Sequence, residues 1–238
     1  MKKTTILIAL IIVARFLTGC SKPVSVLVIS GGHAYDTVEF FDAFRSLEHV
    51  EFDPVYHPEA LTMLQTGKTD AYDVLVFYDF IVDMPERDSI VFENLTRQGK
   101  PMLYLHHALA TFQKWDGYME MVGGRYVMPG YCTDTTLFSD FKHDIDLEVK
   151  VADPEHPVTL GMKDFTIHDE GYSNITTLPG VTPLLETGHP DCAPLVGWTN
   201  KKDQSTIVYL MLGHDKKAYQ NPAYTQLLNQ SIHWLAEQ

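Results

Sequence analysis

The sequence predicts an α/β protein with a mostly parallel sheet, helices on both of its faces and an antiparallel extension in the second half. In the first half, short apolar runs rich in Val, Ile and Leu alternate with amphipathic stretches, which is typical of strands joined by crossover helices. In the second half, residues 146–151 alternate between polar and apolar, as an antiparallel strand with one solvated face does.

The first half divides into strands and helices in regular alternation. Aromatic residues at 40, 41 and 44 share one face of a helical stretch, and Gly99 is placed to end another helix. The expected elements are a strand at 24–30, a helix at 37–47, a strand at 51–56, a short helix opened by His57–Pro58, a strand at 72–79, a helix at 87–98, a strand at 101–105 and a helix beginning near His107 or Ala108.

This alternation breaks after Trp115, where a long insertion rich in Gly and Pro extends to residue 141. The elements expected beyond it are strands at 146–151, 165–167, 182–185, 193–198 and 205–212 and a closing amphipathic helix at 222–235. Residues 20–238 contain no internal repeat, low-complexity tract or linker. They are therefore expected to form a single domain, which is a reasonable size for one core.

Histidines follow three of the predicted strands directly. They are His33, the pair His106 and His107, and His214. Ligands of open parallel sheets bind outside the carboxyl ends of the strands, so these imidazoles are expected at one site. Neutral imidazole is both the commonest metal ligand and the usual acid–base group near neutral pH. We expect His107 and His214 to be catalytic, and His33, His107 and His214 to be candidate metal ligands. The alternative is that they cap helices or stabilise turns.

A second group of candidates comes from the acidic and aromatic residues. Glu170 follows Asp169 and is a possible general base, although both carboxylates could equally be solvated loop charges. Aromatic rings suit a sugar-binding cleft, and Phe112 and Tyr131 are further aromatic candidates, although core packing explains most such residues. The expected substrate-binding residues are His33, Tyr35, Asp79, His106, Trp115 and Tyr172.

The first nineteen residues have the features of a targeting segment rather than of the fold. Lys2 and Lys3 precede a short apolar core, and residues 17–20 (Leu-Thr-Gly-Cys) resemble a bacterial lipoprotein box. The resemblance implies cleavage before Cys20 and lipidation of its thiol, which would hold the protein on a membrane by acyl chains only. We expect an outer-membrane anchor facing the periplasm. An ordinary secretory peptide cut nearby is the alternative.

Charge and motifs exclude several classes of partner. The formal net charge is −13 at pH 7, and removal of residues 1–19 takes away three basic residues and no acid, which leaves −16. Such a chain is not expected to bind nucleic acid. No G-x-G-x-x-G spacing is present, so no nucleotide cofactor is expected. Cys132 and Cys192 could pair in an oxidising compartment. The oligomeric state stays open.

Several short motifs, taken in order, resemble the ThuA-like (trehalose-utilisation) family. They are Ser-Gly-Gly-His at 30–33, residues 72–79, Leu-His-His-Ala at 105–108, residues 152–159, residues 169–172 and Leu-Gly-His-Asp at 212–215. The resemblance covers about residues 24–236. It implies a flavodoxin-like sheet related to class I glutamine amidotransferases. In those enzymes a nucleophilic cysteine follows the strand equivalent to 101–105, where this chain has His106, so glutamine hydrolysis is not expected. His214 resembles their second catalytic residue.

The resemblance also implies a carbohydrate as substrate. The leading hypothesis is a periplasmic enzyme acting on a keto-sugar or keto-glycoside by proton abstraction next to a carbonyl, followed by isomerisation or elimination of the glycosidic group. A divalent metal such as zinc could polarise the carbonyl. One alternative is a non-catalytic sugar-binding lipoprotein that uses the same cleft. The other is a metal-dependent hydrolase that uses a bound water.

Overall fold

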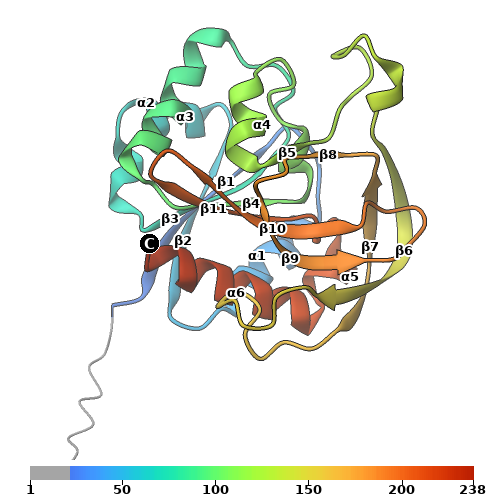
Figure 1. The fold of residues 1–238 in the computed structure, drawn as a ribbon. Helices are drawn as coiled ribbons and strands as arrows, with labels where there is room; N and C mark the ends of the chain where they lie inside the picture. The colour runs from blue at the N-terminus through green and yellow to red at the C-terminus, as the bar shows by residue number, and fades with distance from the viewer. Residues whose placement is uncertain (1–21) are drawn as a thin grey trace, which may run out of the picture.

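The computed structural model describes residues 22–238 and is built around a sheet of nine strands (Figure 1). The strands lie in the order β2-β1-β3-β4-β11-β10-β9-β6-β7, and β5 and β8 form a separate pair. Their bounds are β1 Val24–Gly31, β2 Val50–Tyr56, β3 Val74–Asp79, β4 Met102–Leu105, β5 Gly124–Arg125, β6 Asp140–Val151, β7 Phe165–Ser173, β8 Thr176–Thr177, β9 Thr182–Thr187, β10 Leu195–Lys202 and β11 Ser205–Leu210. The expected leader at 1–19 and Cys20 lie outside the described residues.

The five strands β2, β1, β3, β4 and β11 run parallel, which confirms the predicted sheet. Every residue of β3, β4 and β11 is buried, because helices cover both faces of this part of the sheet. Gly31 at the end of β1 lies opposite Asp79 at the end of β3. The chain therefore delivers the residues that follow each parallel strand to one edge of the sheet.

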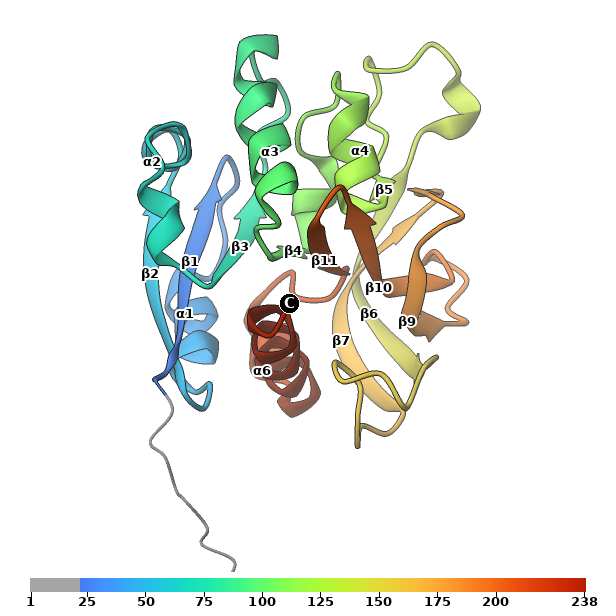
Figure 2. The same ribbon diagram turned by 60° about the vertical axis from the view of Figure 1, so that its left-hand side comes forward.

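The helices form a layer on each face of the sheet (Figures 1 and 2). Helices α1, α5 and α6 contact one another on one face, and α2, α3 and α4 lie on the other. Their bounds are α1 Thr37–Arg45, α2 Glu59–Gln65, α3 Glu86–Gln98, α4 Asp116–Val122, α5 Lys216–Tyr219 and α6 Pro222–Ala236, with the 3-10 helices η1 Lys68–Ala71, η2 His106–Ala110 and η3 Thr135–Leu137. As expected, Gly99 ends α3 in the left-handed conformation, with φ 76°.

The second half of the sheet is antiparallel, as the sequence predicts. Two of its strands are longer than expected, since β6 begins at Asp140 and β7 continues to Ser173. Asp169 and Glu170 therefore belong to a strand and not to a solvated loop. The pattern hid this because residues 169–172 are all buried, so the polar residues of β7 do not mark a face exposed to water.

The region after Trp115, predicted as a long insertion, contains α4, β5 and η3, and β5 pairs with β8 from later in the chain. The indole N–H of Trp198 donates to the carbonyl of Val122 at 2.8 Å, which fixes the end of α4. After β4 the predicted helix is the short 3-10 helix η2. Cys132 and Cys192 are both free. Within residues 22–238, no helix has the length and apolar character needed to cross a membrane.

Candidate functional site

His106 occupies a sharp turn directly after β4. Its φ of 46° is left-handed, a conformation that is strained for a residue other than glycine and that is common at functional sites. The ring is fully buried, and its Nδ1–H donates to the carbonyl of Met211 at 2.6 Å. Burial lowers the pKa of His106 well below its usual value, so the ring is neutral. Its Nε2 therefore carries a lone pair and accepts a hydrogen bond from the Tyr172 hydroxyl at 2.9 Å.

His214 follows β11 on a loop that is held through its backbone. The Asp169 carboxyl accepts from the N–H groups of Gly213 at 2.7 Å and His214 at 2.9 Å. The Tyr219 hydroxyl donates to the His214 carbonyl at 2.9 Å. The imidazole is left free to reach the site, where its Nδ1 lies 3.1 Å from Nε2 of His106. Burial lowers the pKa of His214 as well.

Glu170 lies on β7, with His106 and His214 on one side and His143 of β6 on the other. Its Oε2 is 2.6 Å from Nδ1 of His143 and 3.2 Å from Nδ1 of His214. Burial, followed by the neighbouring carboxyl of Asp169, raises the pKa of Glu170 to about 8. A carboxyl with this pKa is present in both protonation states near neutral pH, as an acid–base catalyst must be.

A β-bulge directs His143 toward Glu170. Lys142 pairs with Gly171 and Ile145 pairs with Asp169, so two residues of β6 lie opposite Glu170 alone. The second of the two, Asp144, has a φ of 54°. Bulges of this kind bend a strand and redirect a side chain, often beside active sites. Sequence reasoning assigned nothing to His143, because a bulge leaves no periodic signal.

His33 and His107 form the other side of the site. Gly31 and Gly32 both have positive φ, and a Cβ at Gly32 would lie 2.1 Å from the carbonyl oxygen of Phe80, so this turn requires glycine. The His33 and His107 rings are 5.0 Å apart. Burial, then the nearby His33, lowers the pKa of His107 to about 3.

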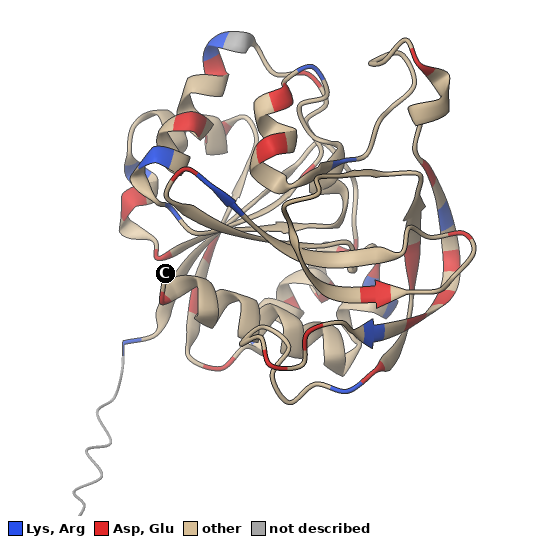
Figure 3. Cartoon of the chain, in the orientation of Figure 1, with Lys and Arg blue, Asp and Glu red and all other residues tan. Residues whose placement is uncertain are grey.

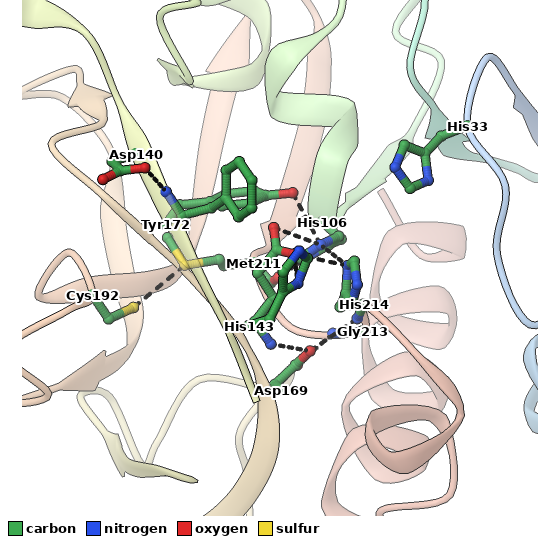
Figure 4. Close-up of polar contacts among 12 residues, drawn as sticks. His33, His106, Asp140, His143, Asp169, Tyr172, Cys192, Met211, Gly213 and His214 are labelled. Carbon is green, nitrogen blue, oxygen red and sulfur yellow. Dashed lines mark hydrogen bonds and ion pairs between the residues drawn. The ribbon is translucent and has the colours of Figure 1, made fainter. Parts of the chain in front are cut away.

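These side chains line one cleft with a volume of about 190 Å³. Figure 4 shows His106, His143 and His214 converging, with His33 to one side. Phe80, Tyr126, Met128 and Phe141 give the cleft apolar walls. The residues that line it are His33, Phe80, His106, His107, Ala110, Tyr126, Met128, Phe141, His143, Glu170, Tyr172 and His214.

Three expected substrate-binding residues lie elsewhere. The Tyr35 hydroxyl donates to Ser30 at 3.0 Å, and its ring packs against the core. Asp79 is buried and pairs with Nε2 of His57 at 3.0 Å. Trp115 lines a separate depression on the α3–α4 side, beside Arg97 and Lys202. Asp79 ends β3 as predicted, but its side chain points toward His57, the residue after β2, and does not line the cleft.

A different set of residues from the predicted one could hold a metal. Within residues 22–238, the group of donor atoms lying within 4.8 Å of one another comes from His106, Glu170 and His214. His214 belongs to the predicted set, whereas His33 and His107 do not belong to this group. Figure 3 shows acidic residues along β6 and β7, with basic residues between those of β6.

The fold and the cleft define the chain as a flavodoxin-like α/β protein with a site of imidazoles and one carboxyl at the carboxyl edge of its parallel strands. The family comparison agrees with this class. Residues 25–235 match the ThuA family, described as trehalose utilisation, and the chain belongs to this family. No curated protein matches the sequence.

Solved structures share the fold at low sequence identity. A ThuA-like protein from Parabacteroides merdae ATCC 43184 superposes with a TM-score of 0.73 at 18% identity, covering 90% of each chain. Another, from Bacteroides uniformis ATCC 8492, gives 0.69 at 16% identity, covering 91% of this chain and 93% of that one. A β-galactosidase from Bacillus circulans sp. alkalophilus gives 0.57 at 13% identity, covering 88% of this chain and 30% of that one.

Proposed function

We propose that this protein is a carbohydrate-processing enzyme of the periplasm that acts on a keto-sugar or keto-glycoside. The observation that carries the proposal is the position of Glu170, a carboxyl inside the cleft that contacts two imidazoles and whose pKa is raised to about 8. The family description, trehalose utilisation, supports a sugar as the substrate class. The low pKa values of His106 and His107 favour neutral rings that bind and orient rather than carry a proton.

The chemistry begins with proton abstraction. The Glu170 carboxylate takes the proton from the carbon next to the ketone, and the electron pair of the broken C–H bond moves onto the carbonyl oxygen. In an isomerisation, Glu170 returns the proton to the former carbonyl carbon, while the proton of the neighbouring hydroxyl group moves to the former carbonyl oxygen, so that the C=O and C–OH groups exchange places. In an elimination, the bond from the neighbouring carbon to the glycosidic oxygen breaks, and the departing oxygen receives the proton from Glu170 through His143. Either route is balanced without an oxidant or a further reactant.

A metal-dependent hydrolase is the second candidate, and the His106–Glu170–His214 group favours it. Nε2 of His106 lies 3.1 Å from Nδ1 of His214 and 3.8 Å from Oε1 of Glu170, and Nδ1 of His214 lies 3.2 Å from Oε2 of Glu170. Donor atoms around tetrahedral zinc are about 3.3 Å apart. Two neutral imidazoles and one carboxylate are a donor set that zinc accepts. A bound metal would supply Lewis-acid polarisation or activate a water.

Turnover and metal analysis separate these functions. The purified protein is incubated with a 3-keto-disaccharide and, separately, with its unoxidised parent, before and after treatment with EDTA. Consumption of the keto-sugar alone, with or without EDTA, supports acid–base chemistry at Glu170. Hydrolysis of both sugars that is lost with EDTA supports the metal hydrolase. Binding of sugar without turnover supports a non-catalytic sugar-binding lipoprotein and contradicts the enzyme proposal.

The matched variants are Glu170→Gln and Glu186→Gln. Glu186 is an exposed glutamate of β9 outside the cleft. Only the first variant is expected to lose turnover.

We also propose that Cys20 carries a lipid that anchors the protein to the outer membrane, with the cleft in the periplasm. This proposal rests on the apolar run and the lipoprotein box before residue 21.

A further inference from the structure

His107 presents a buried acceptor that has no partner among the described residues. Its ring hydrogen-bonds to the backbone of Tyr78, and Nε2 is both buried and unpartnered. The donating nitrogen is therefore Nδ1, and Nε2 carries a lone pair. The side chain is 5% exposed and lines the cleft. A buried acceptor without a donor destabilises the folded protein, so this nitrogen is positioned to receive a donor from a ligand.

His33 has the same arrangement on the rim of the cleft. Its Nδ1 lies 2.6 Å from the carbonyl oxygen of Ala34 and donates to it, which leaves the Nε2 lone pair available. The His33 and His107 rings are 5.0 Å apart and tilted by 33°, and the edge of Phe80 packs against both. Backbone carbonyls thus fix both rings as acceptors.

The chemistry of the pair selects the class of ligand. Two acceptor nitrogens in a chain of high negative charge do not attract an anion. A metal needs further ligands, and the group within residues 22–238 that meets this requirement is the separate His106–Glu170–His214 set. Neighbouring hydroxyl groups of a sugar offer two donors and no charge, and the apolar edge of Phe80 suits the carbon face beside them.

We propose that His107 and His33 bind a pair of neighbouring hydroxyl groups on the sugar and so determine which ring carbon faces Glu170. This inference rests on the proposed function for the identity of the ligand. The ring of His106 lies 5.5 Å from that of His107, and the ring of His33 lies 6.5 Å from that of His214. One sugar residue in the cleft can therefore contact the acceptor pair on one side and Glu170 on the other.

The test measures binding of trehalose and its monodeoxy analogues by calorimetry, since the acceptor pair requires hydroxyl groups and not the ketone. Wild type is compared with His107→Phe, which keeps a ring packed against Tyr78, with His33→Phe, and with His189→Ala as a histidine control outside the cleft. We expect one analogue to bind wild type at least about tenfold more weakly than trehalose. His107→Phe should lose a similar factor for trehalose and no longer distinguish the two sugars.

Each outcome decides the inference. It is overturned if wild type binds no disaccharide, if His107→Phe and His33→Phe keep wild-type affinity, or if deoxygenation weakens binding by the same factor in wild type and both variants. It is also overturned if zinc loading is lost in these two variants. Should His107→Phe not fold, the exposed His33→Phe carries the comparison. A failure of the proposed function gives a different result. In that case wild type binds trehalose more tightly than its deoxy analogue but does not convert 3-keto-trehalose.

Discussion

Asp169 and Glu170 are neighbours on β7 whose carboxyls serve opposite purposes. Asp169 accepts hydrogen bonds from the N–H groups of Gly213 and His214 and so holds the loop after β11. Glu170 points to the other face of the strand, where it contacts His143 and His214 in the cleft. One carboxyl builds the site, and the other is free for chemistry within it.

The two substitutions should therefore separate stability from activity. Asp169→Ala removes the acceptor of three backbone N–H groups, those of Glu170, Gly213 and His214, and should cost about 2–3 kcal/mol. Each kcal/mol corresponds to a fall of about 2–4 °C in Tm. Glu170→Gln should leave Tm nearly unchanged and reduce turnover by roughly 10²–10⁴-fold. Thermal melting and keto-sugar assays check both, with the exposed Asp146→Ala as control. Equal loss of stability in both variants would contradict the division of roles.

The raised pKa of Glu170 predicts how stability depends on pH. The pKa of Glu170 is higher in the folded protein than in the unfolded chain. Its contribution to the free energy of unfolding is therefore fully present below a pH of about 4.5 and is lost as the pH rises through about 8. The pKa values of His106 and His107 are lowered, so these two residues make the protein less stable as the pH falls below 6.5. Between pH 6.5 and 8, metal-free wild type should therefore lose stability more steeply than Glu170→Gln. Parallel denaturant titrations of the two proteins over this range measure the difference, and identical slopes would contradict the shift.

His143 should matter for activity and little for stability. Its side chain is 52% exposed and contacts Glu170 from the bulge of β6. We expect His143→Ala to lower turnover at least about tenfold and to change stability by no more than about 0.5 kcal/mol. His189→Ala is the matched control away from the cleft. Turnover of the His143 variant at the wild-type rate would exclude a role in proton transfer.

Zinc binding should depend on the newly defined ligand set. Equilibrium dialysis followed by elemental analysis should show reduced zinc in His106→Ala and His214→Ala and unchanged zinc in His33→Ala. The reason is that the donor atoms of the first two lie near each other and near Glu170, whereas His33 is not part of that group. Reduced zinc in His33→Ala and His214→Ala with unchanged zinc in His106→Ala would contradict this set and favour the ligands predicted from the sequence.

Cys20→Ala should release the protein from membranes or block its processing, since lipidation needs the thiol. Fractionation of cells into soluble and membrane parts, with labelling by a fatty-acid probe, makes the measurement. Cys132→Ala is the control, because this free cysteine lies far along the chain from the leader. Membrane binding and cleavage that are unchanged in Cys20→Ala would contradict the anchor.

The sequence revealed the half of the site that depends on parallel strands. His33, His106, His107 and His214 follow strands directly, and a parallel sheet brings strand ends to one edge. Glu170 was a candidate because of its residue type, but its strand was not recognised, since the buried stretch around it lacks alternation.

The rest of the site depends on geometry that leaves no pattern in a single sequence. His143 reaches the cleft through a bulge, and Phe141 lines it from the same strand. Tyr35 and Trp115 were expected there because aromatic rings suit sugars, yet both pack against neighbouring aromatic side chains. Residue type alone does not distinguish a ring in the core from a ring in a cleft.

The direction of β1 has a consequence for how an anchored protein would meet its substrate. Val24 begins this strand at the amino end of the parallel strands, and the cleft lies beyond their carboxyl ends. A lipid on Cys20, four residues before Val24, would tether the molecule from the side opposite its opening. The opening would then face the aqueous compartment. Sugars would enter by diffusion from solution, and a substrate embedded in the lipid surface would lie out of reach.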